Sequence, residues 1–207
     1  MTPTAPTDRL RHAPTQARSR ERLRRVLDAA DEVLAEAGAD AFTTTLVAAQ
    51  AGVPIGSVYR FFPDKEAIVE ALALRYWSDL EDLVAGVADA DGTEPVDDPV
   101  TAVFEALILG FRARPGFLSL WYGGLRTERV RDATRPTRTA IARSIERILA
   151  RRWPDTPRRE RARVAEMVVL AGDGLLREAF RRDRTGDQAV LTESKLMLRA
   201  YIAARLA

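Results

Sequence analysis

Apolar residues return every three or four positions along most of this chain, and this spacing limits the fold more than any other feature. One such stripe comprises Leu23, Leu27, Ala30, Leu34 and Ala37. Residues at this spacing share one face of an α-helix, because the helix makes a turn every 3.6 residues. No stretch shows the β-branched alternation that marks a half-buried strand. The sequence therefore predicts an all-α protein.

Breakers and helix caps divide the chain into about nine expected helices. Gly38 supplies a stop for the first helix, Asp64 is placed to cap the fourth, and the seventh is expected to be interrupted near Pro136. The expected helices span residues 16–37, 44–51, 55–62, 64–88, 100–114, 116–122, 127–152, 158–182 and 187–206. The acidic, breaker-rich segment 89–99 is expected to be a loop.

Composition excludes several kinds of chemistry. The chain has no cysteine, so disulfides, thiolate nucleophiles and cysteine-based zinc sites are excluded. Its single histidine, His12, has no second histidine with which to hold a metal ion. No apolar run approaches the roughly 20 residues that span a bilayer, and residues 1–8 lack the apolar core of a secretory signal. We therefore expect a cytoplasmic protein with no cofactor, no metal and no membrane partner.

Residues 44–62 have the spacing of a helix-turn-helix. Val47 and Val58 can face a small shared core, and Ala48 is small where the two helices touch. Gly52 permits the positive φ that the tight turn between the helices needs. These four residues at these offsets predict two short helices that pack across a turn.

The second short helix is expected to present a polar face outward. Val58 and Phe62 lie one turn apart and are expected to be buried together. The residues left facing outward would be Gly56, Ser57, Arg60 and Phe61. Arg60 can contact guanine with two hydrogen bonds, and Phe61 can touch a thymine methyl group. This surface suits the base edges of a DNA major groove.

Residues around the two short helices suit the DNA backbone. Thr43 or Thr44 can cap the first short helix and offer a hydroxyl to a phosphate, and Tyr59 and Lys65 are placed for further phosphate contacts. Upstream lies a cluster of seven arginines with a single acid, Glu21, among them: Arg9, Arg11, Arg18, Arg20, Arg22, Arg24 and Arg25. This segment suits a phosphate backbone, although a solvated tail and the exposed face of a helix would look the same.

The segment from Thr43 to Glu66 closely resembles the DNA-binding domain of the tetracycline-repressor (TetR) family. The resemblance is carried by Ala51-Gly52-Val53, Tyr59-Arg60-Phe61-Phe62 and Asp64-Lys65-Glu66, and extends over roughly residues 16–77. It implies phosphate contacts by Thr43, Tyr59 and Lys65 and base reading by Gly56, Ser57, Arg60 and Phe61. Pro54 departs from the family pattern, which often has a serine that caps the recognition helix. Proline is tolerated at a helix start, so only one phosphate contact is lost.

The same resemblance implies a division of the chain by role. We expect a disordered basic tail at residues 1–15 and a three-helix DNA-binding domain at residues 16–63. Residues 64–207 would form a ligand-binding and dimerisation domain, which begins with a bridging helix at residues 64–88.

Two apolar stripes near the C-terminus are candidates for a dimer interface. The interface residues expected on them are Val164, Val168, Gly172, Leu175, Val190, Ser194, Leu198 and Tyr201. Paired with their two-fold mates, the two helices would form a four-helix contact. Packing inside one chain is the alternative, and the need to read two half-sites favours the dimer.

An aromatic cluster is the candidate for a small-molecule site. The expected lining residues are Phe104, Phe111, Phe117, Trp121 and Tyr122, with Met167 and Leu170 opposite and Asp173 as the acidic member. An apolar cavity with few polar groups is typical of such sites, whereas aromatic residues at helical spacing also occur in ordinary cores. Asp173 would bind a cationic ligand, pair with Arg112 or Arg126, or lie at the dimer seam.

These expectations describe a ligand-responsive repressor. A homodimer would bind a pseudo-palindromic operator in double-stranded DNA, and an unidentified small apolar or amphipathic effector would release it. An activator or a ligand-insensitive regulator of the same fold is the alternative. A helical enzyme is a third reading, since a carboxylate pair such as Glu105 and Asp173 is possible, but no catalytic motif supports it.

Overall fold

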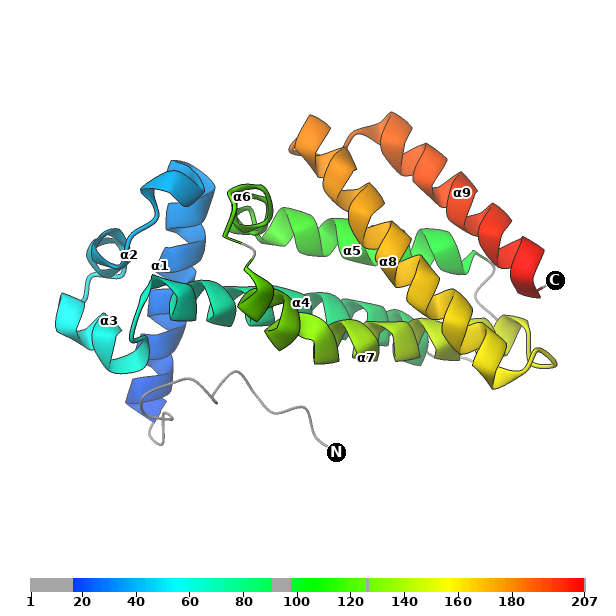
Figure 1. Cartoon of the computed structure of the whole chain (residues 1–207), viewed down its shortest axis with the longest axis horizontal. Helices are drawn as coiled ribbons and strands as arrows, with labels where there is room; N and C mark the ends of the chain where they lie inside the picture. Colours follow the sequence, from blue (N-terminus) through cyan, green and yellow to red (C-terminus); the bar gives the residue numbers. More distant parts are fainter. Residues whose placement is uncertain (1–16, 91–97, 126, 207) are drawn as a thin grey trace. The chain divides into compact units, whose positions relative to one another are not determined.

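The computed structural model describes residues 17–90, 98–125 and 127–206, and within these ranges every regular element is an α-helix (Figure 1). The helices are α1 (Ala17–Ala41), α2 (Thr44–Gln50), α3 (Ile55–Phe61), α4 (Lys65–Asp89), α5 (Pro99–Ala113), α6 (Gly116–Tyr122), α7 (Glu128–Arg152), α8 (Arg158–Arg182) and α9 (Gln188–Leu206). The all-α prediction is confirmed. The tail expected at residues 1–15, with Arg9, Arg11 and His12, lies outside the described residues.

Two helix breaks expected from the sequence have different outcomes in the structure. The regular helix breaks at Gly38 as expected, since Gly38 has the non-helical angles φ 75° and ψ −179°, and a short helical segment beyond this kink continues α1 to Ala41. α7 runs without interruption through Pro136. Proline lacks the N–H that a helix interior uses, yet here the helix continues on both sides of it.

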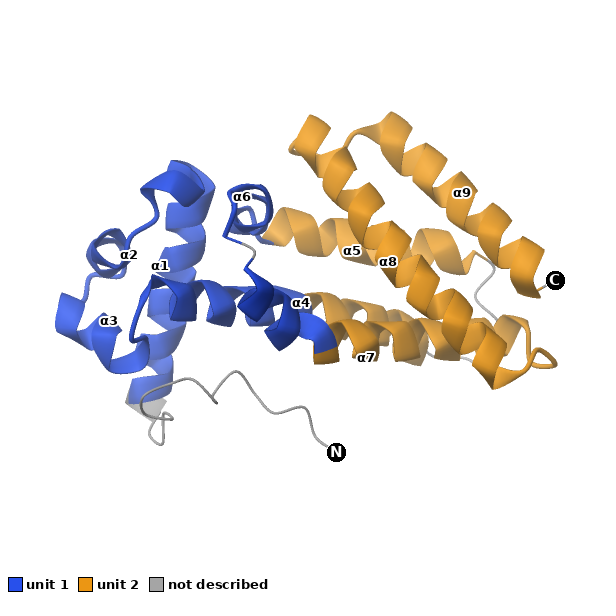
Figure 2. Cartoon of the chain, in the orientation of Figure 1, with its two compact units in different colours: residues 1–77, 114–135 blue, residues 78–113, 136–207 orange. Residues whose placement is uncertain are grey.

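The chain forms two compact units, shown in different colours in Figure 2. Unit 1 comprises residues 1–77 and 114–135, and unit 2 comprises residues 78–113 and 136–207. α4 and α7 each contribute to both units, and all of α6 belongs to unit 1. These units are defined by compactness, whereas the division expected between residues 63 and 64 separates DNA binding from ligand binding and dimerisation. That functional division stays a prediction.

Unit 1 is built on α1, against which both α2 and α6 pack, with α3 packed on α2. Its most deeply buried large side chains are Leu34, Phe42, Phe61, Phe62, Ile68, Leu72, Tyr76, Phe117 and Leu120. The expected cap of α4 is present, because Asp64 Oδ1 accepts a hydrogen bond from the Ala67 N–H at 2.7 Å. These apolar contacts hold the helix-turn-helix in one body with α1.

Unit 2 contains α5, α8 and α9, with α9 packed on both of the others, together with the later parts of α4 and α7. A half-buried ion pair joins α7 to α8, where Arg161 Nε lies 3.1 Å from Glu146 Oε1. Arg161 also donates to the backbone oxygens of Trp153, Pro154 and Thr156, which orders the turn after α7. In the part of the chain that the structure describes, no helix has both the length and the apolar character needed to cross a bilayer.

Candidate nucleic-acid interface

The turn between α2 and α3 has the geometry that its residue types predict. Gly52 adopts φ 62°, in the left-handed region that favours glycine. The Val53 N–H then donates to the Ala48 carbonyl at 3.1 Å, which closes the turn. Val47 and Val58 are fully buried on the facing sides of the two helices. The helix-turn-helix predicted at residues 44–62 is therefore present.

Thr43 is the cap of α2. It has extended backbone angles, and its Oγ1 accepts a hydrogen bond from the Leu46 N–H at 3.1 Å. The Thr43 side chain is exposed, so its hydroxyl hydrogen can still be donated to a second partner. Thr44 has a different partner, because its Oγ1 lies 3.2 Å from the Tyr59 hydroxyl on α3. This pair places two hydroxyl groups from two helices beside each other at the surface.

The exposed face of α3 carries small and polar groups. Gly56, Tyr59 and Arg60 are exposed and Ser57 is half-buried. No side chain caps this helix, since Pro54 at its start makes no side-chain hydrogen bond. The phosphate contact inferred to be lost with the family's serine stays a prediction.

Phe61 is not on this face, and the prediction that its ring projects outward is wrong. Phe61 is only 2% exposed and Phe62 only 1%. Val58 and Phe61 are three residues apart within α3, so both point to its inner side. The helix ends at Phe61, and Phe62 follows in an extended conformation with φ −124° and ψ 115°. The prediction placed Phe62 in the core and Phe61 on the surface because it assumed that the helix continued through Phe62. Since α3 ends at Phe61, helical spacing does not determine which way the Phe62 side chain points.

Lys65 lies at the start of α4 and is half-buried. Its Nζ is 5.7 Å from the centre of the Phe42 ring, a cation–π distance. Phe42 directly precedes the α2 cap Thr43, so this contact places the cation beside the segment that leads into α2. The arrangement fits the expected phosphate contact and leaves part of the side chain accessible.

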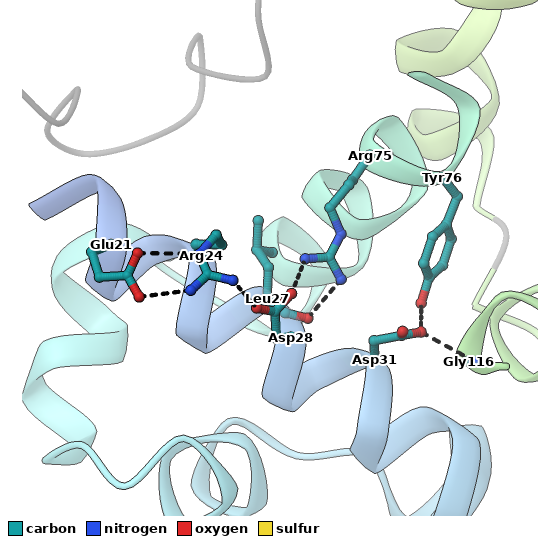
Figure 3. Close-up of polar contacts among 8 residues, drawn as sticks. All are labelled: Glu21, Arg24, Leu27, Asp28, Asp31, Arg75, Tyr76 and Gly116. Atoms are coloured by element: carbon teal, nitrogen blue, oxygen red, sulfur yellow. Dashed lines mark hydrogen bonds and ion pairs between the residues drawn. The ribbon is translucent and has the colours of Figure 1, made fainter. Parts of the chain in front are cut away.

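The arginines of α1 have unequal surroundings. Arg24 donates to Glu21 at 2.7 Å and to Asp28 at 3.2 Å, and the first of these bonds lowers the pKa of Glu21 below its ordinary value. Asp28 in turn accepts from Arg75 of α4 at 2.7 Å (Figure 3). Arg20, Arg22 and Arg25 are exposed. Through Asp28, Arg24 therefore belongs to a network that joins α1 to α4.

The aromatic residues expected to line an effector site fall in both units. In unit 1, Phe117 and Trp121 of α6 are buried with ring centroids 5.0 Å apart, and Tyr122 is 44% exposed. In unit 2, Phe104 and Phe111 of α5 are buried, and Phe111 stacks on Phe180 at 5.0 Å. Both groups pack as ordinary cores do, and their role in ligand binding stays a prediction.

The α8 residues expected opposite these aromatic rings do not form an enclosed lining. Met167 is 41% exposed and Leu170 59% exposed, because the inward side of α8 is occupied by other residues. Asp173 pairs with Arg177, one turn along the same helix, at 3.0 Å. Arg112 instead donates to the Thr185 carbonyl at 2.8 Å, and Arg126 lies outside the described residues.

Most of the expected dimer residues are buried inside one chain. Val164, Val168, Gly172, Ser194 and Leu198 are buried, and Leu175, Val190 and Tyr201 are half-buried. A Cβ added at Gly172 would lie 3.9 Å from Leu198 Cδ1, which shows how closely α8 and α9 pack. The two stripes cover each other within the protomer, the alternative that the sequence had left open. The buried members are therefore not available as a contact surface.

Glu105 and Asp173, the candidate carboxylate pair, each have a basic partner. Glu105 Oε1 lies 2.5 Å from Lys195 Nζ, whereas Asp173 pairs with Arg177. Each acid has its own cation, so nothing in this geometry supports a shared general acid and base.

Comparison with known proteins identifies the family of both parts of the chain. Residues 26–72 match the model described as bacterial regulatory proteins of the tetR family, and residues 94–206 match that of the tetracyclin repressor-like C-terminal domain. A search of the curated proteins found no match.

Solved structures of similar fold are consistent with these two domain matches. A TetR-family transcriptional regulator from Streptomyces coelicolor is 30% identical, with 89% of this chain and 99% of that chain covered and a TM-score of 0.64. The regulator FadR from Bacillus subtilis, in complex with stearoyl-CoA, is 17% identical over 87% and 98% of the two chains with a TM-score of 0.68. The multidrug binding protein EbrR with imidazole is 24% identical over 87% and 94%, at a TM-score of 0.60.

The last two likenesses show the fold alone. The two domain matches and the Streptomyces relative, taken with the helix-turn-helix seen in unit 1, show that this chain belongs to the TetR family of transcriptional regulators.

Proposed function

We propose that this chain is a ligand-responsive repressor that binds a pseudo-palindromic operator as a homodimer. The observation that carries the proposal is the exposed face of α3, where Gly56, Ser57 and Arg60 lie together beside the Thr44–Tyr59 hydroxyl pair. A face with a small residue, a hydroxyl and a guanidinium can approach base edges closely. Arg60 is the residue that reads a guanine by a bidentate contact.

The backbone contacts surround this face. Thr43, Tyr59 and Lys65 come from three different helical segments of unit 1 and are each at least partly accessible. Contacts to phosphate fix the orientation of the recognition helix and carry no sequence information themselves. Their electrostatic part weakens as the salt concentration rises, because the counterions that the protein displaces from the DNA then gain less entropy on release.

A second copy of the chain would use apolar side chains that remain exposed on unit 2. On α8 these are Met167 and Leu170, and on α9 they are Leu196 and Met197, all between 41% and 59% exposed. They lie on the outer sides of the two helices whose inner stripes cover each other. Association through them would hold two recognition helices about 34–36 Å apart, one turn of DNA.

An effector would act by binding one conformation better than the other, because only differential affinity shifts an equilibrium. The solved relatives bind stearoyl-CoA, imidazole and, in a second EbrR structure, ethidium. Stearoyl-CoA and ethidium are amphipathic molecules of different size, which supports the same class of effector here, whereas imidazole is a small polar ring. The contact residues proposed are Phe104 and Phe111 of α5 and Phe117, Trp121 and Tyr122 of α6. The protein would act in the cytoplasm and catalyse no reaction.

The DNA-binding proposal is tested by selecting duplexes from a random library with the purified chain at moderate salt and measuring their affinity by mobility shift. We expect one preferred sequence with two related half-sites. Lys65→Ala should weaken all duplexes alike and reduce the salt slope by about 1, whereas Arg60→Ala should flatten the preference at one position at a cost of about 1–3 kcal/mol. Arg159→Ala, an exposed arginine at the start of α8, is the matched control and should change neither. Selection that yields no preferred sequence would refute the proposal.

A further inference from the structure

A buried polar contact joins three helices of unit 1 at one carboxylate (Figure 3). Asp31 of α1 is 7% exposed, and its Oδ1 accepts two hydrogen bonds. One comes from the hydroxyl of Tyr76 on α4, and the other from the Gly116 N–H at the start of α6, at 3.2 Å. Burial raises the pKa of Tyr76 far above its ordinary value, so the hydroxyl remains a neutral donor.

Gly116 approaches this carboxylate more closely than any other residue type can. A Cβ at this position would lie 2.4 Å from Asp31 Oδ1 and 2.6 Å from the Asp31 backbone oxygen. It would also lie 2.9 Å from the Tyr76 hydroxyl oxygen. The backbone of α6 at Gly116 therefore lies against both the carboxylate and the backbone oxygen of Asp31 on α1. Rings reinforce the contact, since Tyr76 and Phe117 meet edge to face with centroids 5.2 Å apart.

The other end of α6 rests on α1 in the same way. A Cβ at Gly123, the cap residue of α6, would lie 1.9 Å from Ala39 Cβ. Ala39 directly follows the kink at Gly38, and Phe42 and the α2 cap Thr43 come shortly after it. α6 thus contacts α1 on both sides of the kink. The second contact lies next to the segment that leads into the helix-turn-helix.

We propose that Asp31 is a positioning residue for operator binding, which acts through α6. By holding Gly116 and Tyr76, its carboxylate keeps α6 on α1, and α6 in turn holds the Ala39–Thr43 segment that presents the phosphate contacts. The role in operator binding rests on the proposed function, whereas the coupling between α6 and residues 39–46 is a property of unit 1 alone. Loosening the start of α6 should therefore loosen residues 39–46 as well.

Amide hydrogen exchange on the full chain without DNA tests this coupling. Tyr76→Phe removes one hydroxyl and should speed exchange by about tenfold both in α6 and in residues 39–46, the scale expected when a buried hydrogen bond is lost. Thr192→Val, which also removes one hydroxyl but at an exposed position of α9, should leave both segments as they were. Faster exchange confined to α6, or no change in either segment, would overturn the proposal.

Variants of Asp31 separate positioning from general destabilisation. Asp31→Asn keeps an acceptor oxygen and should restore most of the protection that Asp31→Ala loses in both segments. Equal exchange in these two variants would count against the proposal. Gly116→Ala should reproduce the loss by steric displacement of α6, and the coupled change in residues 39–46 would be the supporting result.

A second experiment measures the same exchange with bound DNA, using a duplex that the unchanged protein prefers in the library selection. Because linkage is reciprocal, bound DNA should slow exchange in α6, and Tyr76→Phe should weaken binding by about tenfold and abolish that protection. If a preferred duplex exists but leaves α6 exchange unchanged, the inference fails while the proposed function stands. If no preferred duplex exists, the proposed function fails, and the DNA-free measurement still decides the coupling.

Discussion

Replacing Phe61 separates the core role seen in the structure from the base-reading role expected from its position in the sequence. The ring is 2% exposed and packs on the inner side of α3 with Val58. A buried phenylalanine removes roughly 200 Å² from water, and at about 25 cal/mol per Å² this contributes about 5 kcal/mol. Measured Phe→Ala changes in cores are about 3–5 kcal/mol, so Phe61→Ala should lower the free energy of unfolding by about that amount.

Two assays check this prediction. Urea unfolding followed by circular dichroism gives the change in free energy, and the same loss should lower Tm by about 10 °C for a chain of this size. Arg60→Ala is the neighbouring control, since Arg60 is exposed and its removal should change the free energy of unfolding by no more than about 0.5 kcal/mol.

The decisive measurement concerns the thymine methyl group. In a selected duplex, each thymine can be replaced by deoxyuracil, which removes only that methyl. If Phe61 is a core residue, the unchanged protein and Phe61→Leu should show the same pattern of affinities across these duplexes. A methyl whose removal weakens binding by the unchanged protein but not by Phe61→Leu would refute the buried assignment, as would an unaltered stability of Phe61→Ala.

Three further predictions follow from individual contacts. Asp64→Ala removes the cap bond of α4 and should lower the free energy of unfolding by about 1 kcal/mol in urea, while Asp64→Asn should retain most of it. Leu170→Glu should shift the protein toward monomer in analytical ultracentrifugation, whereas Leu109→Glu, equally exposed on α5 at 61%, should not, and a dimer unaffected by Leu170→Glu would place the interface elsewhere. Hydrogen bonds from Arg181 and Arg182 lower the pKa of Glu178 to about 2 from an ordinary 4.5, so their stabilisation is complete above pH 4.5 and is lost as the pH falls toward 2. An NMR titration of the Glu178 carboxyl should show this midpoint, and Arg181→Ala should raise it.

Local patterns predicted much of unit 1 because the physical requirements there are local. Gly52 in a tight turn and Asp64 before a helix each satisfy the backbone within a few residues, so their roles can be read from neighbouring sequence. Phe61 and Phe62 mark where such reasoning stops. Helical spacing assigns a face only while the helix continues, and this one ends between them.

An apolar stripe on a helix predicts that this face is buried, but it does not predict which helix or second chain packs against it. Val168 and Leu198 were consistent with either a second copy or a neighbouring helix, and in the structure α8 and α9 bury each other's stripes. The Asp31 contact had no signal in the sequence, because its three residues lie on three helices and Gly116 is 85 positions away. A buried acid cannot be distinguished from a solvated one by periodicity alone.

Residue patterns alone were enough to predict that the chain is helical, where most helices begin and end, and that one pair forms a helix-turn-helix, since these follow from hydrogen bonding and side-chain spacing within a few turns. The side chains that remain exposed on α3, α8 and α9, and the packing of α6 on α1, became known only from the folded molecule. Burial and contact between distant segments depend on how the helices pack in three dimensions, and that packing is a property of the whole chain.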